Sequence, residues 1–174
     1  KWQNNYETYV KKIKEAVLET KGEVILYNND LIDAMFFSTS NGYTENSADI
    51  FSNNMPYLVS VDSSWDKDES PAFSSTKEVL KSEFLFNLGL DSNSSINIGN
   101  IEKTNTGRVK TITINNKKFD ASKIRSIFNL KSTSFTIKVN QDKVTFDVNG
   151  YGHGVGMSQY GASGMAKAGY EYKD

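Results

Sequence analysis

The sequence predicts an α+β fold, with antiparallel hairpins and several short to medium helices around a polar cleft. Some segments repeat apolar residues at helical spacing, and others alternate apolar and polar residues as half-buried strands do. The order of these segments also lacks the strand–helix–strand rhythm of a parallel sheet. The chain has 174 residues, of which 37% are apolar and 12% aromatic, enough for the core of one domain or of two small ones.

Composition and charge exclude several classes of function. The chain has 20 basic and 21 acidic residues without a basic stripe, so we expect no nucleic-acid partner. It has no cysteine, which excludes disulfides and thiolate metal sites within this chain. No apolar run approaches the roughly 18 residues of a membrane span, and no signal peptide is visible. Because Lys1 already stands in a helical pattern, we expect a fragment of a longer protein.

The first quarter of the chain predicts one helix and two strands. Apolar residues three and four apart predict an amphipathic helix over residues 2–20, which Lys21-Gly22 ends. Strands are expected at 23–27 and 31–38, joined by a tight turn at Asn28-Asn29 because asparagine tolerates positive φ. The near-continuous apolar run at the end of the second strand indicates burial on both faces.

The central part of the chain predicts a strand at 56–61 and a helix at 75–88. Ser75 and Glu78 have the spacing of a capping box at the start of that helix. Strict alternation over residues 108–114 then predicts a half-buried strand.

The remaining elements lead into a glycine-rich stretch. Asn115-Asn116 turns the chain into a strand at 117–119, and a short helix is expected at 121–128. Strands at 134–139 and 143–148 form a hairpin. A further helical face follows the glycines.

In that stretch, residues 149–161, four glycines alternate with other residues from Gly150 to Gly156, and the only histidine, His153, lies among them. Such a segment is too glycine-dense for a stable strand or helix. The spacing fits neither the dinucleotide fingerprint nor a phosphate loop. Its backbone N–H groups are therefore expected to form a surface for anions or polar ligand oxygens.

A second polar segment covers residues 38–47, where every residue except Gly42 and the aromatic Tyr43 is a serine, threonine, asparagine or glutamate. Such a segment is either a solvated loop or one wall of a saccharide site, because sugars need many donors and acceptors. Trp65 either covers the core or offers its ring face to a sugar. Asp66 either caps a helix or turn or offers its carboxylate to the hydroxyls of a sugar.

Specific motifs add a resemblance. Gly-His-Gly-Val-Gly-Met-Ser-Gln at 152–159, followed by an aromatic residue and Gly-Ala, resembles the signature of the stage II sporulation protein D / amidase-enhancer family. The Ser-Thr-Ser and Thr-Glu of residues 38–45, Pro-Tyr-Leu at 56–58 and Trp-Asp at 65–66 also resemble it. On this resemblance, residues 1–174 are the C-terminal majority of a peptidoglycan-cleaving domain, with an insert or subdomain at about 72–135.

The resemblance implies a lytic transglycosylase that cuts denuded peptidoglycan strands between MurNAc and GlcNAc during engulfment in endospore formation. An acid protonates the glycosidic oxygen and then, as a base, takes the proton of the C6 hydroxyl, giving a 1,6-anhydro product. This route needs no second carboxylate to activate water. The implied partners are glycan strands, a sporulation cell-wall amidase and a membrane scaffold protein. The implied location is the extracytoplasmic face of the mother-cell membrane of a Gram-positive spore former, with an anchor absent from this chain.

One family feature is missing from these residues. The glutamate taken as the acid lies in a Glu-Met-Pro segment of the family, and this chain has no such segment. Some clostridial members also bind zinc through a Cys/His cluster in the same upstream region. We therefore expect no cofactor within this chain, zinc only through upstream residues, and the principal acid upstream.

The candidate site residues are those that match family motifs. The catalytic candidates are Glu45, Asp66 and Tyr57. The substrate-binding candidates are Ser38, Ser40, Thr44, Trp65, His153, Ser158 and Gln159. Glu45 is expected to face His153 across a trough and to be the best carboxylate here for proton transfer. Structural alternatives are that Glu45 caps a turn and that His153 braces its loop by bonding a carbonyl.

Two other functions remain open at this point. One is a non-catalytic cell-wall-binding or amidase-activating module, in which the glycine stretch only holds sugar or partner. The other is a hydrolase that depends on His153, for which the sequence offers no convincing nucleophile.

Overall fold

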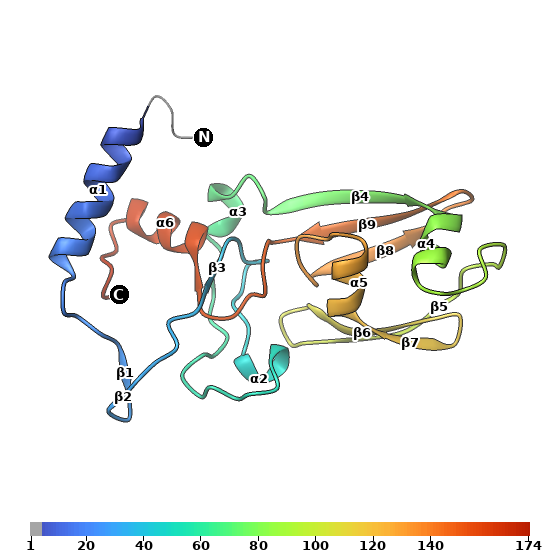
Figure 1. Ribbon diagram of the computed structural model, residues 1–174, viewed down its shortest axis with the longest axis horizontal. Coiled ribbons are helices and arrows are strands. Elements are labelled where there is room, and N and C mark those ends of the chain that lie inside the picture. Colours follow the sequence, from blue (N-terminus) through green and yellow to red (C-terminus); the bar gives the residue numbers. More distant parts are fainter. Residues whose placement is uncertain (1–4) are drawn as a thin grey trace. The chain divides into compact units, whose positions relative to one another are not determined.

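The computed structural model describes residues 5–174, and the chain divides into one unit ending at Ala34 and a second from Met35 to Asp174. Both helices and short, mostly antiparallel sheets are present among these residues, which confirms the α+β class. Figure 1 shows the elements of both units.

The first unit is a helix followed by a small hairpin. Helix α1 (Tyr6–Glu19) confirms the predicted amphipathic helix, although residues 2–4 of that prediction lie outside the described residues. Strands β1 (Leu26–Tyr27) and β2 (Asp30–Leu31) pair antiparallel, and the turn asparagines have φ of 51° and 68°. The turn is therefore confirmed, but the two strands are much shorter than expected.

The second unit contains two three-stranded sheets. In the first, β9 (Lys143–Asn149) lies between β4 (Ser74–Leu80) and β8 (Phe135–Val139), with both pairings antiparallel. Residues 75–80 were expected to start a helix, and this prediction is wrong: the seven-residue ladder of β4 with β9 takes precedence over the capping-box spacing. A helix, α4 (Lys81–Asn87), begins only after that strand.

The second sheet has the order β5-β6-β7, formed by β5 (Ile98–Lys103), β6 (Val109–Ile114) and β7 (Lys117–Asp120). Helix α5 (Ala121–Ile127) follows β7 directly. The predictions for β6, β7, α5 and the β8–β9 hairpin are confirmed. Figure 1 shows this sheet on the opposite side of α5 from the β4-β9-β8 sheet.

Both sheets contribute to one hydrophobic core, together with α4 and α5. Phe84 of α4 stacks on Phe128, with ring centroids 5.2 Å apart, and Phe146 of β9 lies 5.3 Å from Phe128. Ile112 and Ile114 of β6 are completely buried against this cluster. The core fixes the end of β9, and therefore the place where the glycine-rich stretch begins.

The rest of the second unit consists of short elements around that stretch. Strand β3 (Phe36–Phe37) pairs in parallel with β10 (Met157–Ser158), which leads into α6 (Gln159–Lys167). Two single-turn helices, α2 (Ser47–Ile50) and α3 (Asp66–Glu69), interrupt the intervening chain.

Two sequence predictions fail in this region. Residues 56–61 form no strand; instead, backbone bonds to Thr44 and Ser47 hold this segment. The apolar run at 34–37 is buried only at Phe37, whereas Phe36 is 58% exposed. The run was expected to be buried on both faces, but only Phe37 is buried, against the glycine-rich stretch.

Candidate functional site

The four alternating glycines are required by close packing. Each has positive φ, from 75° at Gly150 to 113° at Gly152. A Cβ at Gly150 would lie 2.8 Å from the Thr39 carbonyl oxygen, and one at Gly152 would lie 2.8 Å from Cβ of Phe37. Glycine alone combines such a backbone with such close neighbours. Residues 150–156, the glycine loop hereafter, therefore lie directly against the polar segment of residues 38–47 and the strand before it.

The N–H groups of this loop are largely used inside the protein. Gly150 donates to the Phe73 carbonyl, Tyr151 to that of Thr39 and Gly152 to that of Lys131, at 2.8–3.0 Å. The Val155 N–H donates to Nδ1 of His153. The expectation that these amides form an anion-binding surface is therefore wrong for these four positions, because their donors are already satisfied by the fold.

Asp66 is the centre of a buried hydrogen-bond cluster. Its carboxylate accepts bonds from the Ser40 backbone N–H (3.1 Å) and the hydroxyls of Ser40 (2.8 Å), Ser63 (2.7 Å) and Ser158 (2.6 Å). Ser158 is also the N-cap of α6 and accepts from the Gly161 N–H. Asp66 is completely buried, so this cluster joins α3, α6 and the polar segment.

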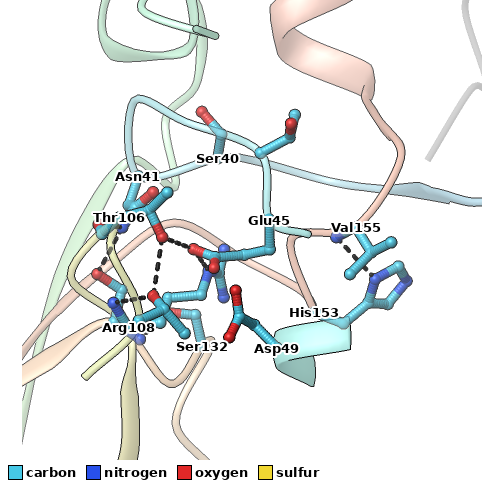
Figure 2. A network of polar contacts seen from close by, with 12 residues as sticks. Ser40, Asn41, Glu45, Asp49, Thr106, Arg108, Ser132, His153 and Val155 are labelled. Atoms are coloured by element: carbon cyan, nitrogen blue, oxygen red, sulfur yellow. Dashed lines mark hydrogen bonds and ion pairs between the residues drawn. The ribbon is translucent and has the colours of Figure 1, made fainter. Parts of the chain in front are cut away.

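Glu45 lies in a second buried cluster (Figure 2). Its backbone N–H donates to the Gly154 carbonyl at 2.8 Å, which places it next to the glycine loop. Its carboxylate accepts from the Thr106 hydroxyl and lies 3.3 Å from Nε of Arg108. The side chains of Glu45 and Arg108 are 1% and 0% exposed. The prediction placed Glu45 on the wall of a trough; the structure instead buries its carboxylate in an ion pair.

Arg108 contacts the glycine loop through its guanidinium group. Its Nη1 donates to the Gly152 carbonyl at 3.0 Å, and a Cβ at Gly154 would lie 2.7 Å from its Cζ. Within residues 5–174, Nε and Nη2 of this arginine have no hydrogen-bond partner. Burial lowers the pKa of Arg108 to about 10, while the Glu45 charge opposes that change. Burial raises the pKa of Glu45, against the opposing effects of Thr106 and Arg108.

His153 is half-buried between two phenyl rings. The ring centroids of Phe37 and Phe51 lie 5.8 Å and 5.6 Å from that of the imidazole. Its Nδ1 accepts the Val155 N–H at 3.1 Å, so the neutral imidazole carries its proton on Nε2. Burial lowers the pKa of His153, as does the positive charge of Arg108, while a backbone hydrogen bond with Phe36 opposes this. These contacts agree with the bracing alternative.

Thr44 and Ser38 are engaged with backbone. The Thr44 hydroxyl donates to the Val59 carbonyl at 3.2 Å and accepts the Val61 N–H at 2.9 Å. The Ser38 carbonyl accepts the Tyr160 N–H. Both residues therefore hold neighbouring segments in place.

Three further candidates lie nearer the surface. Trp65 is half-buried, with its ring centroid 6.1 Å from that of Tyr170. Tyr57 is half-buried in the segment between α2 and α3, and Gln159 is exposed at the start of α6.

The structure thus brings the predicted polar segment and the glycine loop together. Glu45 and Val155 form an isolated parallel bridge, and Thr39 and Tyr151 form an antiparallel one. The carboxylate of Glu45 points toward Thr106 and Arg108, away from the imidazole of His153 (Figure 2). The two backbones are neighbours, but the two side chains do not face each other.

Sequence reasoning missed the role of Arg108. The sequence placed Arg108 at the start of the alternating strand of residues 108–114, where Gly107-Arg108-Val109 resembles the same family, but neither signal indicates an ion pair. Within the described residues, no three His, Asp or Glu side chains gather as metal ligands would. Likewise, no helix between residues 5 and 174 is both long and apolar enough to cross a membrane.

Comparison with known proteins relates the whole chain to one kind of protein. Over 174 residues, 99% of the chain, it is 45% identical to stage II sporulation protein D of Bacillus subtilis (strain 168) and 42% identical to that of Bacillus amyloliquefaciens. The chain is a homologue of stage II sporulation protein D. A more distant relative is the amidase enhancer of Bacillus subtilis (strain 168), 29% identical over 213 aligned residues that include 91% of the chain. No protein-family model matches.

The chain spans about half the length of these sporulation homologues, 50% in both cases, and 30% of the amidase enhancer. The resemblance inferred from the glycine loop is therefore confirmed by whole-chain similarity.

Proposed function

We propose that this chain is part of a peptidoglycan lytic transglycosylase that acts on denuded glycan strands, between MurNAc and GlcNAc, during engulfment. The observation that carries the proposal is the 42–45% identity to stage II sporulation proteins D along 99% of the chain. Their name supports a role in sporulation. The proposal places the protein at the extracytoplasmic face of the mother-cell membrane, with glycan strands, a sporulation amidase and a membrane scaffold protein as partners.

The burial of two carboxylates determines how the chemistry is assigned. Asp66 accepts four hydrogen bonds and Glu45 is in a buried ion pair. A general acid must come within about 3 Å of the oxygen that it protonates, and neither group meets this condition while buried. We therefore assign Glu45 and Asp66 the task of positioning the cleft, and we assign the acid to a glutamate outside these 174 residues.

The reaction then proceeds in two proton transfers. The acid protonates the glycosidic oxygen and the bond to C1 of MurNAc breaks. The resulting carboxylate takes the proton of the C6 hydroxyl of the same sugar, whose oxygen attacks C1. The products are a free GlcNAc hydroxyl end and a 1,6-anhydro sugar, and no water is consumed. The residues of this chain hold the strand and exclude water from C1.

The test is the chemical form of the product. The protein in its full natural length, incubated with denuded glycan strands, is expected to release fragments with anhydro ends, which mass spectrometry separates from hydrolysed ends by the mass of one water. Hydrolysed ends, or no cleavage in conditions where the strands bind, would contradict the proposal.

A second candidate is a module that activates an amidase without cutting glycan. The 29% identity to an amidase enhancer favours it, and so does the burial of both carboxylates. An amidase assay with and without the protein separates the two: this candidate requires faster amidase turnover while the glycan strands stay intact.

A His153-dependent hydrolase has little support from the geometry. Nδ1 of His153 already accepts a backbone N–H, and burial lowers the pKa of the imidazole. Full activity in His153→Ala would remove this candidate altogether.

A further inference from the structure

A polar pocket of about 530 Å³ lies beside α5 and the glycine loop. Its walls include the serine hydroxyls of α5, an asparagine amide, two cations and an aromatic ring. These residues are Ser122, Ser126, Asn129, Arg125, Lys131 and Tyr151. None of the candidate catalytic or substrate-binding residues lines it, so it is separate from the groups around Glu45 and Asp66.

The charge of this pocket is one-sided. Arg125 and Lys131 line it, and no Asp or Glu does. Between residues 5 and 174, neither cation forms an ion pair, whereas other lysines do: Lys138 pairs with Asp147 and Lys143 with Glu78, each at 2.7 Å. Two cations without carboxylate partners in one concave site favour an anionic ligand.

The arginine is held in place. Its Nε donates to the Leu130 carbonyl at 3.3 Å, and the Leu130 N–H donates back to the Arg125 carbonyl at 2.9 Å. This closed turn passes through Asn129 at a φ of 51°. Burial lowers the pKa of Arg125, but an arginine stays protonated in proteins, so its charge is retained in a partly desolvated place. Its two terminal nitrogens keep the fork that suits a carboxylate.

An aromatic ring completes the pocket. Tyr151 is 46% exposed, and Nζ of Lys131 lies 6.0 Å from the centroid of its ring. The Gly152 N–H donates to the Lys131 carbonyl at 3.0 Å, so the cation and the ring are fixed to the same loop. The tyrosine side chain has an apolar ring and a polar hydroxyl, so it suits a ligand that has both apolar and polar groups. A pocket lined by an aromatic ring, two cations and two serines matches a sugar that carries a negative charge.

We propose that this pocket binds a carboxylate-bearing sugar, with Arg125 and Lys131 on the carboxylate and the Tyr151 ring against the sugar. This rests on the proposed function, because each muramic acid of a glycan strand has a lactyl carboxylate that is free once its peptide is removed. The pocket would then favour strands without stem peptides over strands in which that carboxyl is an amide.

The test compares three oligosaccharides by isothermal titration calorimetry. They are a GlcNAc–MurNAc tetrasaccharide with free lactyl carboxylates, the same tetrasaccharide with those carboxyls amidated, and chitotetraose. Arg125→Gln is expected to weaken binding of the free acid about 10- to 100-fold, as loss of a charge-assisted bond does, and to leave chitotetraose binding unchanged. Lys131→Gln provides a second variant that keeps the Arg125 turn. Lys123→Gln is the matched control, because Lys123 is an exposed cation of the same helix and does not line the pocket.

The outcomes separate the two proposals. Equal binding of the free acid by the wild type, R125Q and K131Q, with glycan binding intact, overturns the pocket and leaves the proposed function standing. Absence of any glycan binding by the wild type overturns both. Glycerol 3-phosphate serves as a competitor, and if it binds more tightly than the free-acid tetrasaccharide, the site is a phosphate site and the carboxylate assignment is wrong.

Discussion

Replacing Glu45 by glutamine tests whether the buried ion pair organises the site. The change keeps the shape of the side chain and removes its charge, which leaves the completely buried Arg108 without a counter-charge. At a separation of 3.3 Å, the attraction is about 5 kcal/mol for an effective dielectric constant of about 20. Breaking such a pair from one side costs about 3–5 kcal/mol. Because the new amide keeps an oxygen for Thr106, we expect the lower end.

The assay is thermal unfolding at neutral pH. A loss of about 3 kcal/mol lowers the Tm of a chain of this size by roughly 6–12 °C. Glu78→Gln is the matched control, because Glu78 pairs with Lys143 at a shorter 2.7 Å but both side chains are 53% exposed. Solvent screens that pair, so its loss should move the Tm by no more than about 2 °C. Burial, and not distance, would then explain the difference.

A double-variant cycle locates the effect in the pair. If Arg108→Met and Glu45→Gln each destabilise the protein by leaving the other partner alone, the double variant should lose about 2 kcal/mol less than the sum of the single changes. The reasoning is refuted if E45Q unfolds within about 2 °C of the wild type, or if the two losses simply add.

Three further predictions concern the groups around this pair. Gly154→Ala should destabilise the protein by at least about 2 kcal/mol more than Gly107→Ala, measured by urea titration of the two variants. Both glycines have φ near 90°, but only at Gly154 would the new Cβ meet Arg108. Asp66→Asn should lower the free energy of unfolding by roughly 3 kcal/mol, because the amide N–H groups of the new asparagine face donors that then lose their acceptor. Asp68→Asn on the same helix should change that free energy little in the same urea titration. The pKa of His153, measured by NMR from the only imidazole signal, should lie below the ordinary value of 6.5. Because the folded pKa is lowered, the contribution of His153 to stability is present above pH 6.5 and is lost as the pH falls through the folded pKa. A midpoint at or above 6.5 would contradict the buried, Val155-bonded imidazole.

Local patterns predicted the elements that depend on local signals. The alternation in β6, the helical spacing in α1 and the two asparagine turns all formed where expected. Residues 75–80 did not form the expected helix, because their strand is stabilised by pairing with β9, whose partner residues lie 63–73 positions further along the chain. A capping-box spacing is a local preference of about 1 kcal/mol, and a seven-residue ladder outweighs it.

The sequence predicted which segments of the site lie together, but not how their side chains are arranged. Motifs indicated that the Thr44-Glu45 turn and the glycine loop belong together, and a backbone bond of 2.8 Å from Glu45 to Gly154 joins them. Nothing local to Glu45 announces that Arg108, 63 residues away, would take its carboxylate into the interior. Long-range charge pairing is invisible to periodicity, so a carboxylate in a polar motif cannot be assigned to chemistry or to architecture before its partner is known.

The glycine loop is the most recognisable stretch of this chain, and its glycines are explained by packing alone. Each one lets the loop approach Thr39, Phe37, Arg108 or Met35 more closely than any side chain would allow. Substituting these glycines would therefore impair any activity through the fold, whatever the ligand. The residues of the loop that remain able to meet a ligand are those between the glycines, above all the exposed Tyr151 and the half-buried His153. Tyr151, which lines the polar pocket, is therefore the loop position at which a variant separates ligand binding from folding, because the imidazole of His153 braces the loop through its bond to the Val155 N–H.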